Sequence, residues 1–404
     1  VSIPTGESVQ IGFRLSAAPA QNVELGLSLT PESDAGFQLD SPGTLTFTAA
    51  NWNIQQQVSI SLDEQSAAEE RTGRLRVYAA GTVALRDVYV TLTETQKIDE
   101  QPARGVIVND VQFAEDFWTS GQAWAWGTPL DIRPSVSPKS PLQEKLSADL
   151  QILGWRVDPP RCEVTQVQVA DATGADRRPQ SVAMLFDSSA SMGWNDPDEL
   201  RKRGGKRFLA EMRSSNGDEA MVADFGAGRE GPFYRSRLLS EFSSDLTAHE
   251  AAIDGVTAIG GTPLYSSTTE VCKYIDNELL QRDALRYLLL FADGGPSYDG
   301  GTWQQATHAA NDGNIPIIAL GLGPAAEGAS GERPNAVSVM RRLSEKTSGI
   351  YVPVKNAESL ESYMGQLGDQ IFLEQMKFDF LINPDTVQPG EEITLTVETN
   401  LGEV

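Results

Sequence analysis

Four unbroken apolar runs in the second half of the chain constrain its fold more than any other feature. Stretches with helical patterns separate them, and in chain order they read SVAMLF, AMVADF, LRYLLLFA and IPIIALGLG. A strand loses its alternation of apolar and polar residues when both of its faces are buried, as in a parallel sheet covered by helices. The order of these segments predicts a doubly wound α/β domain over residues 181–373.

The segments before this domain alternate apolar and polar residues instead. In residues 1–95, six or seven short alternating segments such as NVELGLSLT lie between turn-forming clusters such as PESDAG, and this pattern predicts a β-sandwich. Residues 96–104 are polar and aperiodic and are interpreted as a linker. Residues 105–180 return to β patterns with frequent proline, which predicts an irregular β domain.

The last segment, residues 374–404, alternates again and is expected to form two strands and a turn of an immunoglobulin-like domain. Because the two ends of a domain usually lie close together, this segment could complete a sandwich that residues 105–180 begin. The alternative is a separate domain that is cut off at Val404. The chain also opens at Val1 in a strand-like pattern, so we expect it to be a fragment of a longer protein.

The charge balance excludes one class of partner. The chain has 56 acidic and 32 basic residues, and its formal net charge is −24. Binding to nucleic acid needs clustered Lys and Arg to neutralise phosphates, so we expect no nucleic acid partner. No stretch is apolar enough to span a membrane, so we expect no membrane-spanning segment in this chain.

Cysteine and histidine are too scarce for a thiolate or imidazole metal site. Cys162 and Cys272 lie far apart without metal-ligand spacing, and the sequence leaves open whether they stay free or form one bridge. His249 and His308 are the only histidines, which excludes a histidine-rich transition-metal site by number.

The first apolar run ends in a carboxylate that is followed by hydroxyls, in the stretch MLFDSSASMGW. Asp187 ends the run, and Ser189 and Ser191 follow at every second position. Ligands of open α/β sheets bind beyond the carboxyl ends of the strands. Two further loops are expected at that edge, AIGGTPLYSS with Thr262 and FADGGPS with Asp293. Two carboxylates and three hydroxyls are the oxygen-rich set that a hard divalent cation prefers.

The same residues have two alternative explanations. Asp187, Ser189 and Ser191 could simply accept backbone N–H groups at a strand-to-helix turn. A serine nucleophile would need a nearby base, but neither histidine lies on a predicted strand-end loop and no GxSxG motif is present. We therefore expect no catalytic residues and no enzymatic activity, and the arrangement of all five residues in three loops favours the metal site.

The spacing Asp-x-Ser-x-Ser, followed by a loop Thr and a loop Asp, resembles the metal-ion-dependent adhesion site of von Willebrand factor type A domains. The resemblance covers about residues 181–373, including the tail LSEKTSGIYVPVKNAESLESYMGQL, although Ala292 stands where many members have Thr or Ser. It implies a Rossmann-like fold and one divalent cation, with Mg²⁺ as the first expectation and Ca²⁺ or Mn²⁺ as alternatives. The implied ligands, some acting through water, are Asp187, Ser189, Ser191, Thr262 and Asp293.

The N-terminal segment also resembles a known group. The succession PTGESVQIGFRLSAAP, LTFTAANWN and QQVSISLDEQ is similar to the Calx-beta-like, immunoglobulin-type repeats of bacterial surface proteins. Some members of that group bind calcium through acidic loop residues, for which Asp63 and Glu64 are the nearest match here, and a solvated loop is the alternative. The resemblance implies an extracellular or cell-surface location, in a bacterium.

The helix after the metal motif carries signals of its own. Asp196 is expected to cap it, Pro197 to occupy its first turn and Glu199 to complete a capping box. The basic run RKRGGKR at residues 201–207 lies on this helix. It is interpreted as a solvated face, with the steering of an acidic partner as the alternative.

Three functions are compatible with these features. In the first, the cation accepts a Glu or Asp carboxylate of a protein ligand, as in a metal-dependent adhesin. In the second, the chain is a structural protomer of a bacterial surface filament or appendage, and neighbouring subunits fill the site. The third is an accessory subunit of an enzyme complex, as in chelatases, and the flanking β segments argue against it.

Overall fold

The computed structural model divides into two compact units, residues 1–99 with 328–338 and residues 100–327 with 339–404. Asp63, Glu64 and residues 96–102 of the predicted linker lie outside the residues that the structure describes. The described residues are 2–4, 8–15, 17–30, 36–40, 43–62, 72–79, 87–95, 103–132, 146–226, 228, 231–280, 282–297, 299–323, 325, 336–354 and 357–403.

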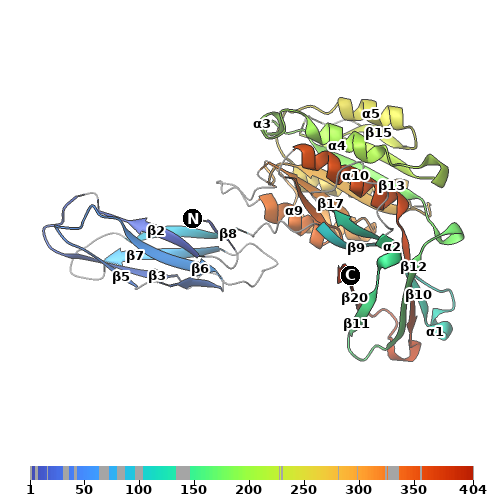
Figure 1. The fold of residues 1–404 in the computed structure, drawn as a ribbon, viewed down its shortest axis with the longest axis horizontal. Helices are drawn as coiled ribbons and strands as arrows, with labels where there is room; N and C mark the ends of the chain where they lie inside the picture. Colours follow the sequence, from blue (N-terminus) through green and yellow to red (C-terminus); the bar gives the residue numbers. More distant parts are fainter. Residues whose placement is uncertain are drawn as a thin grey trace. The chain divides into compact units, whose positions relative to one another are not determined.

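The first unit consists of strands in two sheets around one apolar core (Figure 1). One sheet has the order β1-β8-β7-β3-β5 and the other β2-β6-β4. Phe47 and Leu75 of the first sheet and Val58 and Ile60 of the second belong to the same core. The strands are β1 Ser2–Pro4, β2 Ser8–Phe13, β3 Val23–Leu29, β4 Phe37–Leu39, β5 Thr44–Phe47, β6 Gln56–Leu62, β7 Thr72–Ala79 and β8 Val88–Thr95.

The second unit contains a six-stranded sheet with the order β15-β14-β13-β16-β17-β18. All neighbouring strands run parallel except β15, which is the antiparallel edge. The four apolar runs form β13, β14, β16 and β17, so the predicted parallel sheet is confirmed. The strands are β13 Gln180–Asp187, β14 Glu219–Phe225, β15 Ser236–Ser243, β16 Leu285–Ala292, β17 Ile317–Leu322 and β18 Tyr351–Val354.

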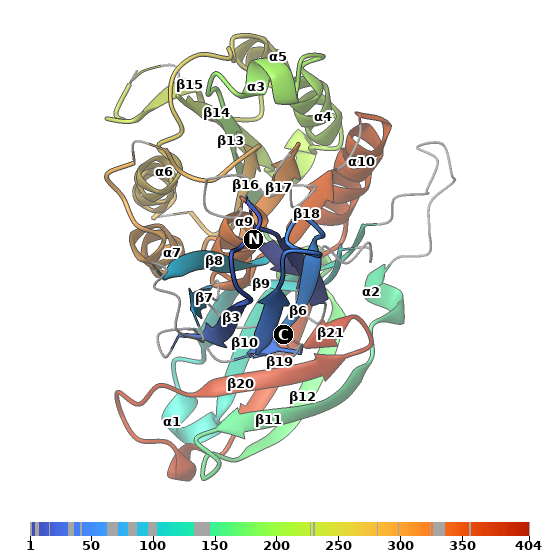
Figure 2. The ribbon, with the colours of Figure 1, turned by 90° about the vertical axis from the view of Figure 1, so that its left-hand side faces the viewer.

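Helices cover both faces of this sheet, with α4, α5 and α10 on one face and α6 and α7 on the other (Figure 2). A Cβ added at Gly205 of α4 would lie 2.8 Å from the ring of Phe186, so glycine lets this helix lie close to β13. The helices of this part are α3 Met192–Asn195, α4 Leu200–Leu209, η2 Ser214–Asn216, α5 Leu246–Asp254, α6 Leu264–Glu278, α7 Trp303–Asp312, α9 Ala336–Glu345 and α10 Ala357–Leu373.

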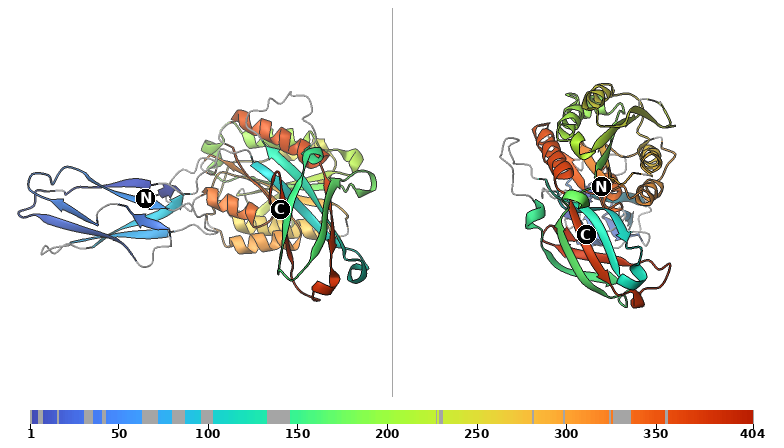
Figure 3. Two further views of the ribbon diagram at one scale, coloured as in Figure 1. Left: turned by 60° about the horizontal axis from the view of Figure 1, so that its bottom comes forward. Right: turned by 90° about the vertical axis from the view of Figure 1, so that its right-hand side faces the viewer.

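The remaining strands of the second unit come from both sides of the α/β region in sequence. They form two sheets with the orders β12-β19-β10-β9 and β11-β20-β21. β19 pairs antiparallel with both β10 and β12, so the end of the chain completes the sheets of the earlier segment (Figure 3). The elements are β9 Ala103–Phe113, α1 Phe117–Ser120, β10 Gln122–Ile132, α2 Leu146–Asp149, β11 Ile152–Asp158, β12 Val164–Asp171, η1 Gly174–Asp176, β19 Met376–Ile382, η3 Pro384–Thr386, β20 Thr394–Thr399 and β21 Gly402–Glu403.

Buried polar contacts attach these sheets to the α/β region. The side-chain amide of Gln370 on α10 exchanges two hydrogen bonds with the backbone of Asp131 at 3.0 and 3.1 Å. The hydroxyls of Thr128 and Tyr287 are 2.7 Å apart between β10 and β16. Since these buried groups satisfy one another, the two regions form a continuous packed body within this unit.

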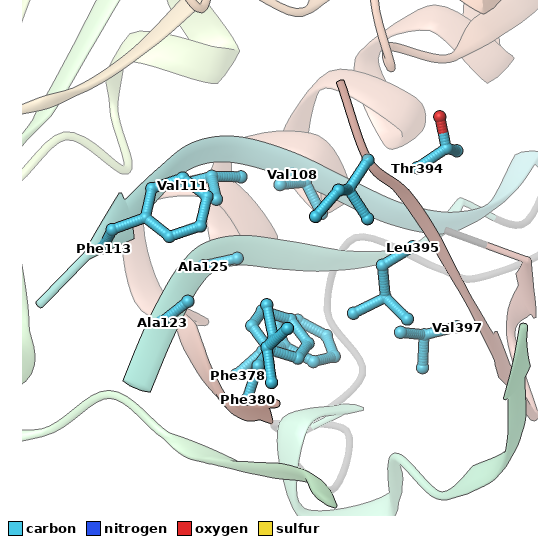
Figure 4. A pocket seen from close by; sticks show the side chains of 12 residues that line it. Val108, Val111, Phe113, Ala123, Ala125, Phe378, Phe380, Thr394, Leu395 and Val397 are labelled. Carbon is cyan, nitrogen blue, oxygen red and sulfur yellow. The ribbon is translucent and has the colours of Figure 1, made fainter. Parts of the chain in front are cut away.

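An apolar cavity of about 300 Å³ remains between the two smaller sheets (Figure 4). Val111 and Phe113 of β9, Phe378 and Phe380 of β19, and Leu395 of β20 contribute to its wall. Three strands face four here, so the smaller sheet leaves part of the larger one uncovered.

The two thiols answer a question that the sequence left open. Cys162 and Cys272 are both buried and unpaired, which agrees with the free-thiol alternative. Among the described residues, no helix combines the length and apolar character that a membrane crossing requires.

The start of α4 differs from the sequence-based prediction. The helix begins only after Glu199, whose φ of 52° is left-handed, so Pro197 and Glu199 precede it and the predicted capping box is wrong. Asp196 does accept from the N–H groups of Leu200 at 2.6 Å and Arg201 at 3.2 Å. The physical reason for this difference is the ion pair between Asp196 and Arg201, at 2.5 Å. It holds the Asp196 carboxylate over the first turn of α4, although Asp196 lies four residues before Leu200.

Several residues of the basic run 201–207 make contacts within the protein, which the interpretation as a solvated face did not predict. Arg201 is fully buried in its pair with Asp196. Lys202 is largely buried and donates to the backbone oxygen of Asp254 at 3.2 Å, while Lys206 contacts the Asp254 carboxylate at 2.6 Å. The interpretation is therefore wrong for Arg201 and Lys202, because these residues fix α4 within the domain.

We predict that Phe378→Ala lowers the free energy of unfolding of this protein by about 3–5 kcal/mol, because Phe378 is only 1% exposed and an adjoining cavity would be enlarged. Leu381→Ala, on the same strand but 37% exposed, is the matched control and is expected to cost less than about 1 kcal/mol. Urea unfolding of both variants tests this prediction. Equal losses would contradict the placement of β19 at the centre of its sheet.

Candidate metal centre

Two carboxylates meet at the carboxyl edge of the parallel sheet. Asp187 is the last residue of β13, and Asp293 follows the last residue of β16. These strands are neighbours, with Phe186 paired to Phe291 and their rings stacked at 4.5 Å. Asp187 and Asp293 are 0% and 2% exposed, so the strand register places two acidic side chains side by side in a buried position.

Hydrogen bonds connect four of the five predicted ligands. The backbone N–H of Ser189 donates to Asp187 Oδ1 at 2.7 Å, and the Ser189 and Ser191 hydroxyls are 2.9 Å apart. The Ser191 hydroxyl donates to Asp293 Oδ1 at 3.1 Å. The structure therefore places these four residues in one continuous cluster, as the sequence predicts.

Thr262, the fifth predicted ligand, lies in a loop that is joined to the same cluster through backbone atoms. Ile259 N–H donates to the Ser188 carbonyl at 2.7 Å, and Ala190 N–H donates to the Gly260 carbonyl at 3.1 Å. Thr262 itself is buried and forms an antiparallel bridge with Ser297, in the loop that follows Asp293. All three predicted loops thus meet at one edge of the sheet.

The charged forms of the two carboxylates are unfavourable in this buried position without a counter-ion. Burial, and secondly the charge of Asp293, raise the pKa of Asp187 to about 7. Burial likewise raises the pKa of Asp293, against hydrogen bonds that favour its charged form. The Arg201 guanidinium lowers both pKa values, but it is a weaker influence than burial.

The residues present fit a hard divalent cation. Asp187 Oδ2 is buried without a hydrogen-bond partner, so one carboxylate oxygen is left for a ligand that the chain does not supply. Hydroxyl and carboxylate oxygens are the donors that Mg²⁺, Mn²⁺ and Ca²⁺ take. No group of three or more His, Cys, Asp or Glu residues suited to a metal occurs in the described part of the chain, so the fit depends on the hydroxyls beside these two carboxylates.

Three supporting contacts were not predicted from the sequence. Asn195 Nδ2 donates to Asp293 Oδ2 at 2.8 Å, which positions the second carboxylate. Ser188, the serine outside the motif, donates at 2.7 Å to Asp224 at the end of β14, and Arg237 pairs with the same carboxylate. Asp224 interrupts the apolar run AMVADF one residue before β14 ends and pairs with Phe186 in the neighbouring strand, and this carboxylate inside an apolar run was the sequence signal for it.

Comparison with known proteins gives structural neighbours only. No protein-family model and no curated protein sequence matches this chain. Similar solved structures include a von Willebrand factor type A protein from Catenulispora acidiphila, at 11% identity over 76% of this chain and 72% of that one, with a TM-score of 0.40.

Two further structures illustrate the range of these neighbours. The D319A mutant of the PilB minor pilin from Streptococcus sanguinis is 11% identical over 87% of this chain and 88% of that one, with a TM-score of 0.38. Proximal thread matrix protein 1 from the mussel byssus, with a zinc-occupied metal-ion-dependent adhesion site, is 14% identical with a TM-score of 0.36. That match covers 48% of this chain and 47% of the mussel chain.

We predict that Gly260→Ala destabilises the protein, because Gly260 has a φ of 97° and an added Cβ would lie 1.7 Å from the Gly226 carbonyl oxygen. The loss is expected to exceed about 1 kcal/mol, because a left-handed φ and a backbone clash act together. Gly294→Ala, beside Asp293 but with no atom within 4 Å of the new Cβ, is the matched control. The melting temperatures of both variants test this prediction. An equal decrease in the two would contradict the close packing of the loops that contain Gly226 and Gly260.

We also predict that the metal-free protein loses stability as the pH rises towards 7. Asp187 has a folded pKa of about 7 and an unfolded pKa of about 4, so the native state binds more protons between these values and the free energy of unfolding falls with pH. In EDTA, the melting temperature of the wild type should therefore fall more steeply between about pH 4 and pH 7 than that of Asp187→Asn. The exposed neighbour Asp198→Asn should keep the wild-type slope, and parallel slopes for all three proteins would refute the prediction.

Proposed function

We propose that this protein binds an acidic group of a protein partner through a divalent cation held at Asp187, Ser189, Ser191, Thr262 and Asp293. The observation that carries the proposal is the buried, unpartnered Oδ2 of Asp187, in a hydrogen-bonded cluster that also holds Asp293. The described residues supply two carboxylates there, and the other three proposed ligands are neutral hydroxyls. A hard cation takes six or more oxygen ligands, so a carboxylate from outside the chain is chemically suited to complete the set.

We propose Mg²⁺ as the bound ion. Mg²⁺ is usually held by one or two carboxylates and keeps part of its shell for water or a guest. Two carboxylates and three neutral hydroxyls match that pattern better than the larger oxygen set of Ca²⁺, which commonly contains more carboxylate and carbonyl oxygens. Mn²⁺ uses similar donors and is the alternative ion.

Binding rather than catalysis is the proposed use of the site. The two ring nitrogens of His249 are engaged with Ser240 at 2.8 Å and with Ser243, away from the motif serines. His308 is largely exposed and faces Asp312 on α7. These contacts give neither Ser189 nor Ser191 a histidine base, which a serine nucleophile would require.

The proposed setting is an extracellular surface, with residues 1–95 acting as a Calx-beta-like β-sandwich. Two sheets that share one core support the sandwich. If instead the chain is a protomer of a surface filament, a neighbouring copy would offer the carboxylate. Metal-dependent self-association, measured by sedimentation velocity of the wild type in Mg²⁺ and in EDTA, separates that alternative from binding to a different protein.

We predict that Mg²⁺ raises the melting temperature of the wild type but not that of Asp187→Ala. An ion that binds only the folded state stabilises it by about 2.7 kcal/mol at one hundred times its dissociation constant. Asp198→Ala is the matched control, because it removes an exposed carboxylate between the motif serines and α4. This variant should show the same Mg²⁺-dependent rise in melting temperature as the wild type. If the melting temperature of the wild type is the same in Mg²⁺, Ca²⁺, Mn²⁺ and EDTA, the proposed function is contradicted.

A further inference from the structure

Two large apolar side chains are exposed beside the candidate metal centre. Trp194 is 70% exposed and lies three residues after Ser191, in the short helix α3. Ile259 is 56% exposed and lies three residues before Thr262. Single exposed apolar residues are common on protein surfaces, but two that flank one site from different loops need an explanation.

Backbone contacts bring these two residues to the same rim. Ile259 N–H donates to the Ser188 carbonyl at 2.7 Å, and Trp194 N–H donates to the Ser191 carbonyl at 3.1 Å. A Cβ added at Gly193, next to Trp194, would lie 3.9 Å from the Cβ of Ala258, next to Ile259. The two loops therefore approach each other closely enough that a single added side-chain carbon would bring them into contact, beside the residues Trp194 and Ile259.

The exposed residues around the site include members of these same two loops. Asp187, Ser189, Thr262 and Asp293 are buried, whereas Ser191 is partly exposed. The exposed residues next to it in the two loops are Ala190, Gly193, Trp194, Ile259 and Gly260. Three of these exposed residues are small, namely Ala190, Gly193 and Gly260, and the other two are the large apolar Trp194 and Ile259.

We propose that Trp194 and Ile259 form an apolar subsite that selects the residue next to the metal-bound carboxylate of the partner. The occupant is a protein segment in which Asp or Glu lies within two residues of a large aliphatic or aromatic side chain. This inference rests on the proposed function, because the carboxylate must first be directed to the cation. The charge of the cation is complementary to the acidic residue, and the exposed Trp194 and Ile259 are complementary to its apolar neighbour.

The chemistry of the rim favours this occupant over a purely polar ligand. Tryptophan is enriched among the residues that dominate binding energy at protein interfaces, because its large rigid surface is buried at little entropic cost. Burial of Trp194 and Ile259 by a partner would also remove water from around the carboxylate contact, which strengthens that contact.

The test is selection of a displayed random peptide library on the immobilised protein in Mg²⁺, with elution by EDTA. Wild type should enrich peptides that contain Asp or Glu within two residues of Leu, Ile, Phe, Tyr or Trp. The double variant Trp194→Ser with Ile259→Ser should still enrich acidic peptides but lose the apolar preference, and wild-type peptides should bind it at least about tenfold more weakly. Leu280→Ser, which removes a 63% exposed side chain just after the other end of α6, is the matched control and should behave as wild type.

The possible outcomes separate this inference from the function on which it rests. Acidic enrichment without an apolar preference, or an apolar preference that survives in the double variant, overturns the subsite and leaves the metal-dependent function standing. No Mg²⁺-dependent enrichment overturns both. Metal-dependent sedimentation with anionic vesicles, lost in the double variant, would assign Trp194 and Ile259 to a lipid surface and also overturn the subsite. An unchanged Mg²⁺ shift of the melting temperature in the double variant verifies that its metal site is intact.

Discussion

The burial of two neighbouring carboxylates, together with the repulsion between them, is the constraint on which the candidate site depends. Asp187 and Asp293 lie at the ends of adjacent strands, where water cannot solvate both charges. The chain relieves this repulsion only in part, through the Ser189 N–H, the Ser191 hydroxyl and the Asn195 amide. Arg201 is a further buried positive charge, but its contact is with Asp196. A cation would relieve the repulsion more completely than these donors, and this supports the proposal that a metal ion binds there.

The parallel sheet provides this arrangement, because it brings separate loops to one edge without any long-range sequence signal. β13 and β16 are neighbours although about one hundred residues separate them in the chain. Close backbone packing then fixes the third loop, since Gly226 and Gly260 approach each other at a distance that no larger residue allows. The same packing exposes Ile259 beside Trp194. Loop packing therefore sets both the depth of the site and the character of its rim.

The two smaller sheets of the second unit are attached to the α/β region by buried contacts. Gln370 and Tyr287 connect them to α10 and β16 through buried hydrogen bonds. β19 lies between β10 and β12, so the four-stranded sheet combines strands from both sides of the α/β region in sequence. Because sequence alternation indicates a strand but not its partner, residues 374–404 allowed two interpretations, and only the pairing distinguished them.

The sequence by itself was enough to predict the parallel sheet and to propose the five candidate ligands, because apolar runs and strand-end polar residues are local patterns that burial imposes directly. It could not determine the start of α4, because the buried pair between Asp196 and Arg201 overrides the local capping pattern. The contacts of Asn195 and Asp224 and the exposure of Trp194 were likewise decided only by the tertiary structure. Each depends on a contact or an exposure created by a distant loop, and a single sequence contains no record of which distant residues meet.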